Sequence, residues 1–166
     1  MVTEPGKPKV GDVAPDFTLP DQAGTPVHLT DLLGHGPVVL YFYPKDATPG
    51  CSTEARAFQA GYDRFVAAGA EVVGISVDSV ASHRRFAAKE KLTFRLLSDR
   101  DGTVRDRYGV DKTLGLFPGR VTFVIDATGI VRRIYSSQLQ PARHSREALA
   151  ALVKLEQPPE SRPSGG

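Results

Sequence analysis

Residues 37–51 read PVVLYFYPKDATPGC, a stretch that carries a buried strand into a loop and then into the start of a helix. The apolar run at its beginning is typical of a central strand covered on both faces. The run stops at Pro44, which has no backbone amide for a sheet ladder. Thr48 suits a helix N-cap and Pro49 the first helical position, so Cys51 falls in the first turn. In open α/β sheets, ligands bind beyond the carboxyl ends of the strands, where we expect this loop to lie.

Strand and helix patterns alternate along the rest of the chain. The predicted strands are Asp16–Leu19, Val27–Leu29, Pro37–Tyr43, Glu71–Val77, Phe94–Leu97, Val121–Asp126 and Ile130–Tyr135. The predicted helices run from about Cys51 to a stop at Gly69, and over Ser79–Lys91, Asp101–Tyr108 and Ala142–Leu155. This order predicts an α/β protein with a thioredoxin-like fold, a mixed central sheet with helices on both faces.

The composition indicates one globular domain. The chain has 166 residues, of which 40% are hydrophobic and 24% charged, close to the average for such proteins. The segments at the two ends are rich in Pro, Gly and Ser. We therefore expect a domain over residues 10–155, with flexible ends at residues 1–9 and 156–166.

Charge and hydropathy exclude several classes of partner. The net charge is +2, without a block of five like charges, which disfavours binding to nucleic acid or to an anionic membrane. No apolar run approaches the roughly 18 residues of a membrane span, and residues 1–9 lack the apolar segment of a secretory signal. The histidines show no metal-ligand spacing, and no Gly-rich phosphate loop occurs. We expect a cytoplasmic protein without a metal or another cofactor.

Cys51 is the single cysteine, so no disulfide can form within the chain. A free thiol with a pKa of about 8.5 is only a few per cent ionised at neutral pH, and lowering that pKa by about two to three units requires about 3–4 kcal/mol. A helix N-terminus supplies roughly 0.3–1 kcal/mol, whereas a positive charge about 4 Å away supplies about 4 kcal/mol before desolvation. A reactive Cys51 therefore needs a neighbouring cation. The candidates are Arg120, Lys45 and, less favoured, Arg56; Arg120 opens a predicted strand and would lie beside the Cys51 loop if the two strands are neighbours.

Several motifs together resemble those of a peroxiredoxin. They are TPGC after a strand that ends in FYP, Glu54 three residues later, and GRVTFVID at residues 119–126. The resemblance is closest to the bacterioferritin-comigratory or peroxiredoxin Q subfamily, and it extends from GDVAPDF at residues 11–17 to Asp126. It implies a thiol-dependent peroxidase that reduces hydrogen peroxide and organic hydroperoxides, with oxidation of Cys51 to a sulfenic acid.

The same resemblance implies roles for individual residues. Its catalytic residues are Cys51, Thr48 and Arg120, and its substrate-binding residues are Pro49, Gly50 and Glu54. Thr48 would bind the peroxide through its hydroxyl, and Pro49 would shield the sulfenate from water. Arg120 would activate the thiolate and the substrate. For Glu54, ordering the helix or pairing with Arg56 or Arg120 is favoured over acid–base chemistry.

The sequence departs from the subfamily in one respect. Many members carry a resolving cysteine five residues after the first, where this chain has Arg56. We therefore expect a one-cysteine enzyme that is regenerated by an external thiol: thioredoxin, glutaredoxin or a low-molecular-weight thiol. A Cys51–Cys51 bond between two chains is another route, and the oligomeric state stays open between monomer and homodimer. The alternative function is a thioredoxin-like redox sensor or binding module with little turnover.

Overall fold

The structure is a computed structural model that describes residues 7–110, 112–113, 117–137 and 139–156. Most of the predicted domain lies in these ranges. The predicted flexible ends, residues 1–9 and 156–166, fall largely outside the described residues.

A five-stranded mixed sheet with the order β5-β4-β3-β8-β9 forms the centre of the protein. Its strands are β3 (Val38–Phe42), β4 (Glu71–Ser76), β5 (Arg95–Ser98), β8 (Val121–Ile125) and β9 (Val131–Ser136). β3 is parallel to β4 and antiparallel to β8, and all of its residues are buried. The central strand predicted from the apolar run is therefore confirmed. Two short antiparallel pairs join β1 (Thr18–Pro20) to β2 (Pro26–His28), and β6 (Lys112–Thr113) to β7 (Phe117–Pro118).

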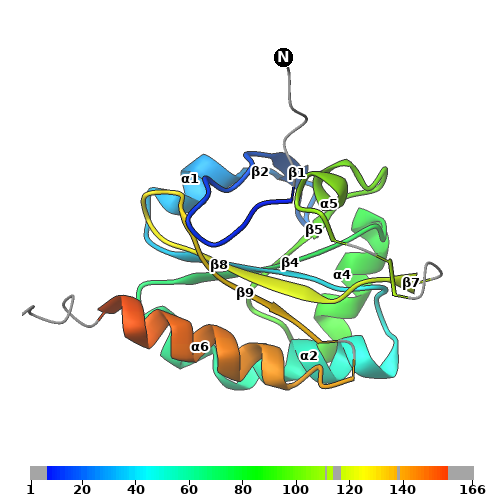
Figure 1. Cartoon of the computed structure of the whole chain (residues 1–166). Helices are drawn as coiled ribbons and strands as arrows, with labels where there is room; N and C mark the ends of the chain where they lie inside the picture. Colours follow the sequence, from blue (N-terminus) through cyan, green and yellow to red (C-terminus); the bar gives the residue numbers. More distant parts are fainter. Residues whose placement is uncertain (1–6, 111, 114–116, 138, 157–166) are drawn as a thin grey trace, which may run out of the picture.

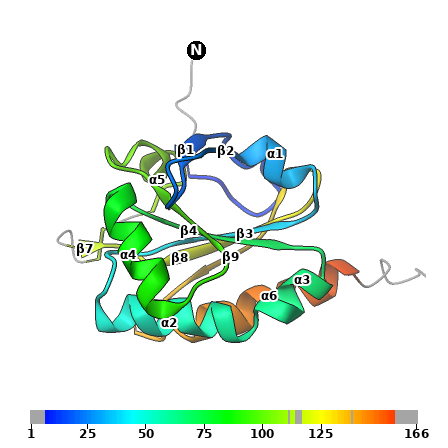
Figure 2. The same cartoon turned by 180° about the vertical axis from the view of Figure 1, so that it is seen from behind.

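Helices cover both faces of this sheet (Figure 1), and the view from behind shows the same layers (Figure 2). The helices are α1 (Leu29–Leu33), α2 (Pro49–Ala60), α3 (Tyr62–Ala67), α4 (Val80–Glu90), α5 (Thr103–Arg107) and α6 (Arg143–Glu156). One layer contains α2, α3, α4 and α6, which bury Phe58, Phe65, Phe86 and Leu152 against the sheet. The other contains α1, α5 and the β1–β2 pair. The predicted thioredoxin-like α/β architecture is confirmed.

The single helix expected from about Cys51 to Gly69 is wrong in two details. The helix begins two residues earlier, at Pro49, and Gly61 divides it into α2 and α3. Gly61 has φ −94° and ψ 6°, outside the helical region, and its N–H still donates to the Ala57 carbonyl. The apolar spacing hides this break because Phe65 of α3 packs into the same cluster as α2. The other predicted elements agree with the structure to within two residues at each end, while β6 and β7 are too short to carry a sequence pattern.

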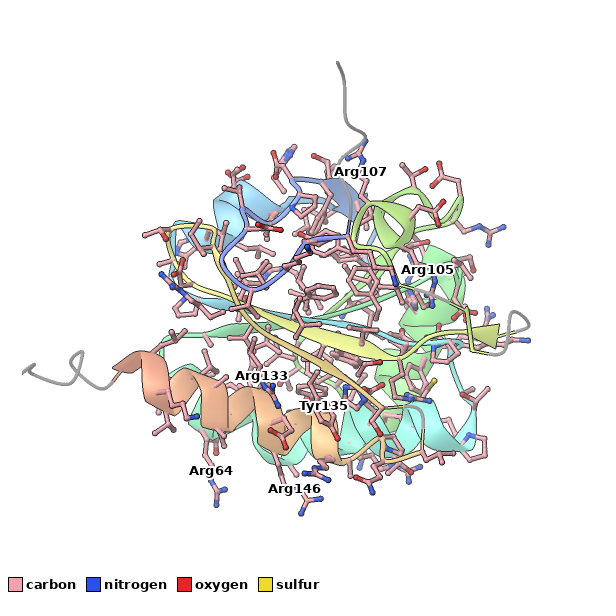
Figure 3. All side chains as sticks on the ribbon, viewed as in Figure 1. Arg64, Arg105, Arg107, Arg133, Tyr135 and Arg146 are labelled. Atoms are coloured by element: carbon pink, nitrogen blue, oxygen red, sulfur yellow. The ribbon has the colours of Figure 1, made fainter. Side chains whose placement is uncertain are left out.

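The pairing of β3 with β8 brings distant parts of the chain together. Phe42, the last residue of β3, lies opposite Val121, the first residue of β8. Arg120 therefore sits at the end of β3 where the loop to Cys51 begins, and the predicted neighbourhood of the two strands is confirmed. Arg105 of α5, one of the arginines labelled in Figure 3, fixes this point by donating from Nη2 to the Gly119 carbonyl at 2.9 Å.

Candidate active site

Cys51 lies in the first turn of α2, at the end of the loop that leaves β3, and is 1% exposed. Thr48 occupies the N-cap position with an extended backbone (φ −86°, ψ 152°), and Pro49 begins the helix, both as predicted. The Thr48 hydroxyl does not cap the helix, however. It donates to the Lys45 carbonyl at 2.8 Å, which fixes the loop and directs the hydroxyl away from the helix amides. The first-turn amides of a helix end are consequently left for another acceptor.

Arg120 is the cation beside Cys51. Its side chain is 4% exposed, and Nη1 donates to Glu54 Oε1 at 2.5 Å. Burial acts to lower the pKa of Arg120, but the charges of Glu54 and Cys51, together with side-chain hydrogen bonds to both, raise it above its ordinary value. The guanidinium thus stays charged and has two partners, a carboxyl and the thiol.

Gly50 allows this guanidinium to approach α2. A Cβ atom at position 50 would lie 3.0 Å from Arg120 Nη2, which is closer than an ordinary van der Waals contact. The absence of a side chain at Gly50 therefore permits Arg120 to reach the first turn of the helix, where the backbone amides are free.

The two other candidate cations do not join the site. Lys45 is exposed. Arg56 is 63% exposed and forms a two-point contact with Glu90 of α4, at 2.6 Å from Nε and 3.1 Å from Nη2. Of the three candidates, the structure brings Arg120 to Cys51.

Glu54 is fully buried behind Arg120, and of the two partners expected for it the structure selects Arg120 over Arg56. Burial raises the pKa of the Glu54 carboxyl to about 8, although the charge of Arg120 and the hydrogen bond to it act in the opposite direction. Its second oxygen, Oε2, has no hydrogen-bond partner. His144 Nδ1 lies 3.6 Å from this oxygen.

A second buried network holds the loop before Cys51. The carboxylate of Asp46 accepts hydrogen bonds from the Tyr43 hydroxyl at 2.6 Å and the Ser82 hydroxyl at 2.8 Å, and it pairs with His83 Nδ1 at 2.7 Å. The Asp46 amide donates to Asp78 Oδ2 at 2.8 Å. These contacts tie the loop to the ends of β3 and β4 and to α4, so that Thr48 and Pro49 start α2 from a fixed point.

His83 and His144 are structural residues of these networks that sequence reasoning passed over. His83 Nε2 lies 3.0 Å from the Leu97 carbonyl, and His144 Nε2 lies 2.8 Å from the Ser137 carbonyl. Both histidines are fully buried. A signal for them exists: His83 stands three residues before the inward-facing Phe86, and His144 four residues before the inward-facing Ala148. For Asp46, no pattern in the sequence indicates burial.

Comparisons with known proteins agree with this architecture. Residues 10–134 match the model of the AhpC/TSA family. The chloroplastic peroxiredoxin Q of Sedum lineare is 51% identical over 146 residues, which cover 87% of this chain and 78% of the relative. That of Arabidopsis thaliana is 52% identical over 143 residues, which cover 86% of this chain and 66% of the relative.

Solved structures give the same result. The crystal structure of peroxidoxin BcpB from Mycobacterium tuberculosis superimposes with a TM-score of 0.84 at 43% identity and covers 89% of this chain and 98% of its own. The bacterioferritin comigratory protein of Xanthomonas campestris, studied for alkyl peroxide reduction, has a TM-score of 0.77 at 36% identity, covering 84% and 91%. This chain belongs to the AhpC/TSA family of peroxiredoxins and is a thiol-dependent peroxidase.

Proposed function

We propose that Cys51 is the peroxidatic residue of this enzyme and that Arg120 holds it as a thiolate. The observation that carries the proposal is the buried Arg120 guanidinium, which Glu54 and Cys51 share. The Cys51 thiolate attacks one oxygen of the hydroperoxide, the S–O bond forms, and the O–O bond breaks. Sulfur loses two electrons and becomes a sulfenic acid, and the departing alkoxide or hydroxide takes up a proton. Negative charge moves onto the departing oxygen, where the Arg120 fork and the α2 amides stabilise it.

The neighbouring residues bind the peroxide. Thr48 donates its hydroxyl to the substrate in place of the Lys45 carbonyl, which it contacts in the free protein. Pro49 is exposed at the rim, where it shields the sulfenic acid from water. Gly50 and Cys51 offer backbone amides from the first turn of α2. Glu54 lies behind Arg120, so it acts on the substrate through the guanidinium.

An external thiol regenerates the enzyme. Arg56 occupies the position of the resolving cysteine, and Cys51 is the single cysteine, so a second thiol comes from thioredoxin, glutaredoxin, a low-molecular-weight thiol or a second copy of the chain. We infer that hydrogen peroxide and organic hydroperoxides are the substrates, and the alkyl peroxide reduction activity described for the Xanthomonas relative supports the organic ones. Both a monomer and a homodimer are compatible with this chemistry.

The location of the enzyme stays a prediction. In the part of the chain that the structure describes, every helix falls short of the length and apolar character required to cross a lipid bilayer. The plant relatives are chloroplastic. The cytoplasmic location expected from the sequence is tested by cell fractionation.

Single-turnover oxidation tests the assignment of Cys51. Because the chain has one cysteine, alkylation after rapid quenching counts the reduced protein directly. We expect wild type to react with hydrogen peroxide far faster than free cysteine does, and Cys51→Ser to lose peroxide consumption in the presence of a thiol. Fast oxidation with no efficient reductant among thioredoxin, glutaredoxin and small thiols would instead favour the redox sensor. Retained turnover in Cys51→Ser contradicts the assignment.

A further inference from the structure

One buried guanidinium in this site faces two acids. Arg120 contacts the Glu54 carboxyl and the Cys51 thiol, and it is the cation that acts on the pKa of Glu54. A second buried anion would have no cation of its own among the described residues at this site, and an unpaired buried charge costs several kcal/mol. One of the two acids is therefore favoured in its protonated form. Catalysis requires that the thiol is the one to ionise.

His144 of α6 lies on the side of Glu54 that faces away from Arg120. There it can influence whether Glu54 or Cys51 is the ionised acid. Nε2 lies 2.8 Å from the Ser137 carbonyl, an acceptor, so Nε2 carries the proton of the neutral ring. Nδ1 is then an acceptor, and it lies 2.8 Å from the Thr122 hydroxyl and 3.6 Å from Glu54 Oε2. Oε2 is buried without a hydrogen-bond partner, and the nearest atom of His144 is this acceptor rather than a donor. In its ionised form Oε2 faces a lone pair.

The surroundings keep His144 neutral. Burial, with the charge of Arg120 acting in the same direction, lowers its pKa to about 4, against a backbone hydrogen bond to Ser137 that acts to raise it. The Tyr135 ring of β9 packs edge-on at 4.8 Å between ring centroids, and Figure 3 shows Tyr135 beside α6. The titratable and charged groups around His144 and Tyr135 are Glu54 from α2, Arg120 before β8, Arg133 and Tyr135 from β9, and Arg143 and Glu147 from α6 itself.

We infer that His144 is a positioning residue of the peroxidatic site, which keeps Glu54 protonated through Nδ1 and so leaves the charge of Arg120 to the Cys51 thiolate. The single lone pair of Nδ1 accepts from the Thr122 hydroxyl at 2.8 Å, so neither group offers Oε2 a donor that an ionised carboxylate would need. The active site of this peroxidase thus extends through Glu54 to the C-terminal helix. The inference rests on the proposed role of Cys51 and adds a residue that does not touch substrate.

Two substitutions at one position separate this role from a purely structural one. The amide of asparagine reaches the position of Nδ1, and that of glutamine reaches the position of Nε2. His144→Asn therefore keeps an acceptor opposite Glu54, whereas His144→Gln keeps the contact to Ser137. We expect His144→Gln to slow oxidation of Cys51 by hydrogen peroxide about tenfold near pH 7, and His144→Asn to stay within about threefold of wild type. His35→Gln, at an exposed histidine without a side-chain partner in the described ranges, is the matched control and should react as wild type does.

A double-substitution cycle shows whether the effect passes through Glu54. In a Glu54→Met background, which has neither acid nor acceptor, we expect His144→Gln to cause no further loss of rate. An equal loss in both backgrounds, or a rescue by glutamine but not by asparagine, overturns the inference. If wild type itself reacts no faster than a free thiol, the proposed function fails instead, so the two failures are distinguishable.

An infrared measurement needs no variant at His144 and covers the case in which those variants do not fold. Wild type near pH 6.5 should show the carbonyl band of a buried protonated carboxyl, and Glu54→Gln should lack that band. If the two spectra agree in this region, Glu54 is ionised and the inference is wrong.

Discussion

Arg120 and Glu54 form a buried hydrogen-bonded pair that joins the start of β8 to α2, with 2.5 Å between Nη1 and Oε1 and with 4% and 0% of the two side chains exposed. The pair fixes the guanidinium from behind, which leaves its other nitrogen beside Gly50 and Cys51.

Glu54→Gln should remove a pH dependence of stability. The pKa of Glu54 is raised from 4.5 to about 8 by burial, so between these values the folded chain binds more protons than the unfolded chain. Stability from this group is therefore fully present below about pH 4.5 and is lost as the pH rises through about 8. We expect the free energy of unfolding of wild type, relative to that of Glu54→Gln, to fall by a few kcal/mol between about pH 5 and about pH 8. Urea unfolding at both pH values measures it, and a constant difference contradicts the raised pKa.

Gly50→Ala should impair chemistry more than stability. The new Cβ would meet Arg120 Nη2 at 3.0 Å and push the guanidinium away from the helix, while alanine is otherwise a good helix residue. We expect the rate of Cys51 oxidation to fall about tenfold, with a change in unfolding free energy below about 1 kcal/mol. Gly61→Ala is the control at the end of the same helix, because its Cβ meets ordinary contacts of 3.6 Å. Equal rates for the two variants would mean that Gly50 does not set the approach of Arg120.

Asp46→Asn should loosen the loop that starts α2. The asparagine amide would replace one of the two oxygens that accept from the Tyr43 and Ser82 hydroxyls, so one buried donor loses its acceptor. Leaving a buried donor unpaired costs about 1–3 kcal/mol, which urea unfolding measures, and Cys51 oxidation should slow as well. Asp63→Asn on the exposed side of α3 is the control, with an expected change within about 0.5 kcal/mol. A stability equal to that of wild type would show that the loop is held elsewhere.

Arg56→Cys should supply an internal resolving thiol. Position 56 follows Cys51 by five residues on one folded helix, so a bond between them requires α2 to open. The substitution also removes the contact between Arg56, which is 63% exposed, and Glu90. We expect peroxide-treated Arg56→Cys to form an intrachain disulfide, seen by mass spectrometry as a loss of hydrogen, and to resist oxidation to the sulfinic acid.

Arg64→Cys is the matched control for this experiment. Arg64 lies on α3 and points away from the body of the protein (Figure 3), so its thiol should form no bond with Cys51. Disulfide formation in both variants would show that the chain opens generally, and formation in neither would show that α2 stays closed during the reaction.

Most of the fold could be predicted from the sequence because the patterns that indicate its strands and helices are local. The apolar run of β3 and the Thr48–Pro49 helix start each depend on a few adjacent residues. The break at Gly61 was missed because Phe65 continues the apolar period across it. The position of Arg120 beside Cys51 depends on which strands pair. The sequence therefore predicted it only on the condition that the two strands are neighbours in the sheet.

The buried polar networks could not be predicted in the same way. Asp46 and His83 are 37 residues apart, and Glu54 and His144 belong to different helices, so their contacts arise from the packing of α4 and α6 on the sheet. A charged or polar residue on a helix indicates exposure unless its partner is known. The inward spacing of His83 and His144 is the one local signal, and it predicts burial without naming a partner.

The most direct test of the role of Arg120 compares two proteins in which the buried carboxyl of Glu54 is already absent. Removing Arg120 alone would leave that carboxyl without its hydrogen-bond donor, so the comparison is Glu54→Gln against Glu54→Gln/Arg120→Gln, both checked for folding. The second-order rate constant for oxidation of Cys51 by hydrogen peroxide near pH 7 is then measured by quenching and alkylation. We predict that loss of Arg120 lowers this rate constant about a hundredfold or more. Equal rate constants for the two proteins would contradict the claim that the guanidinium of Arg120 activates Cys51.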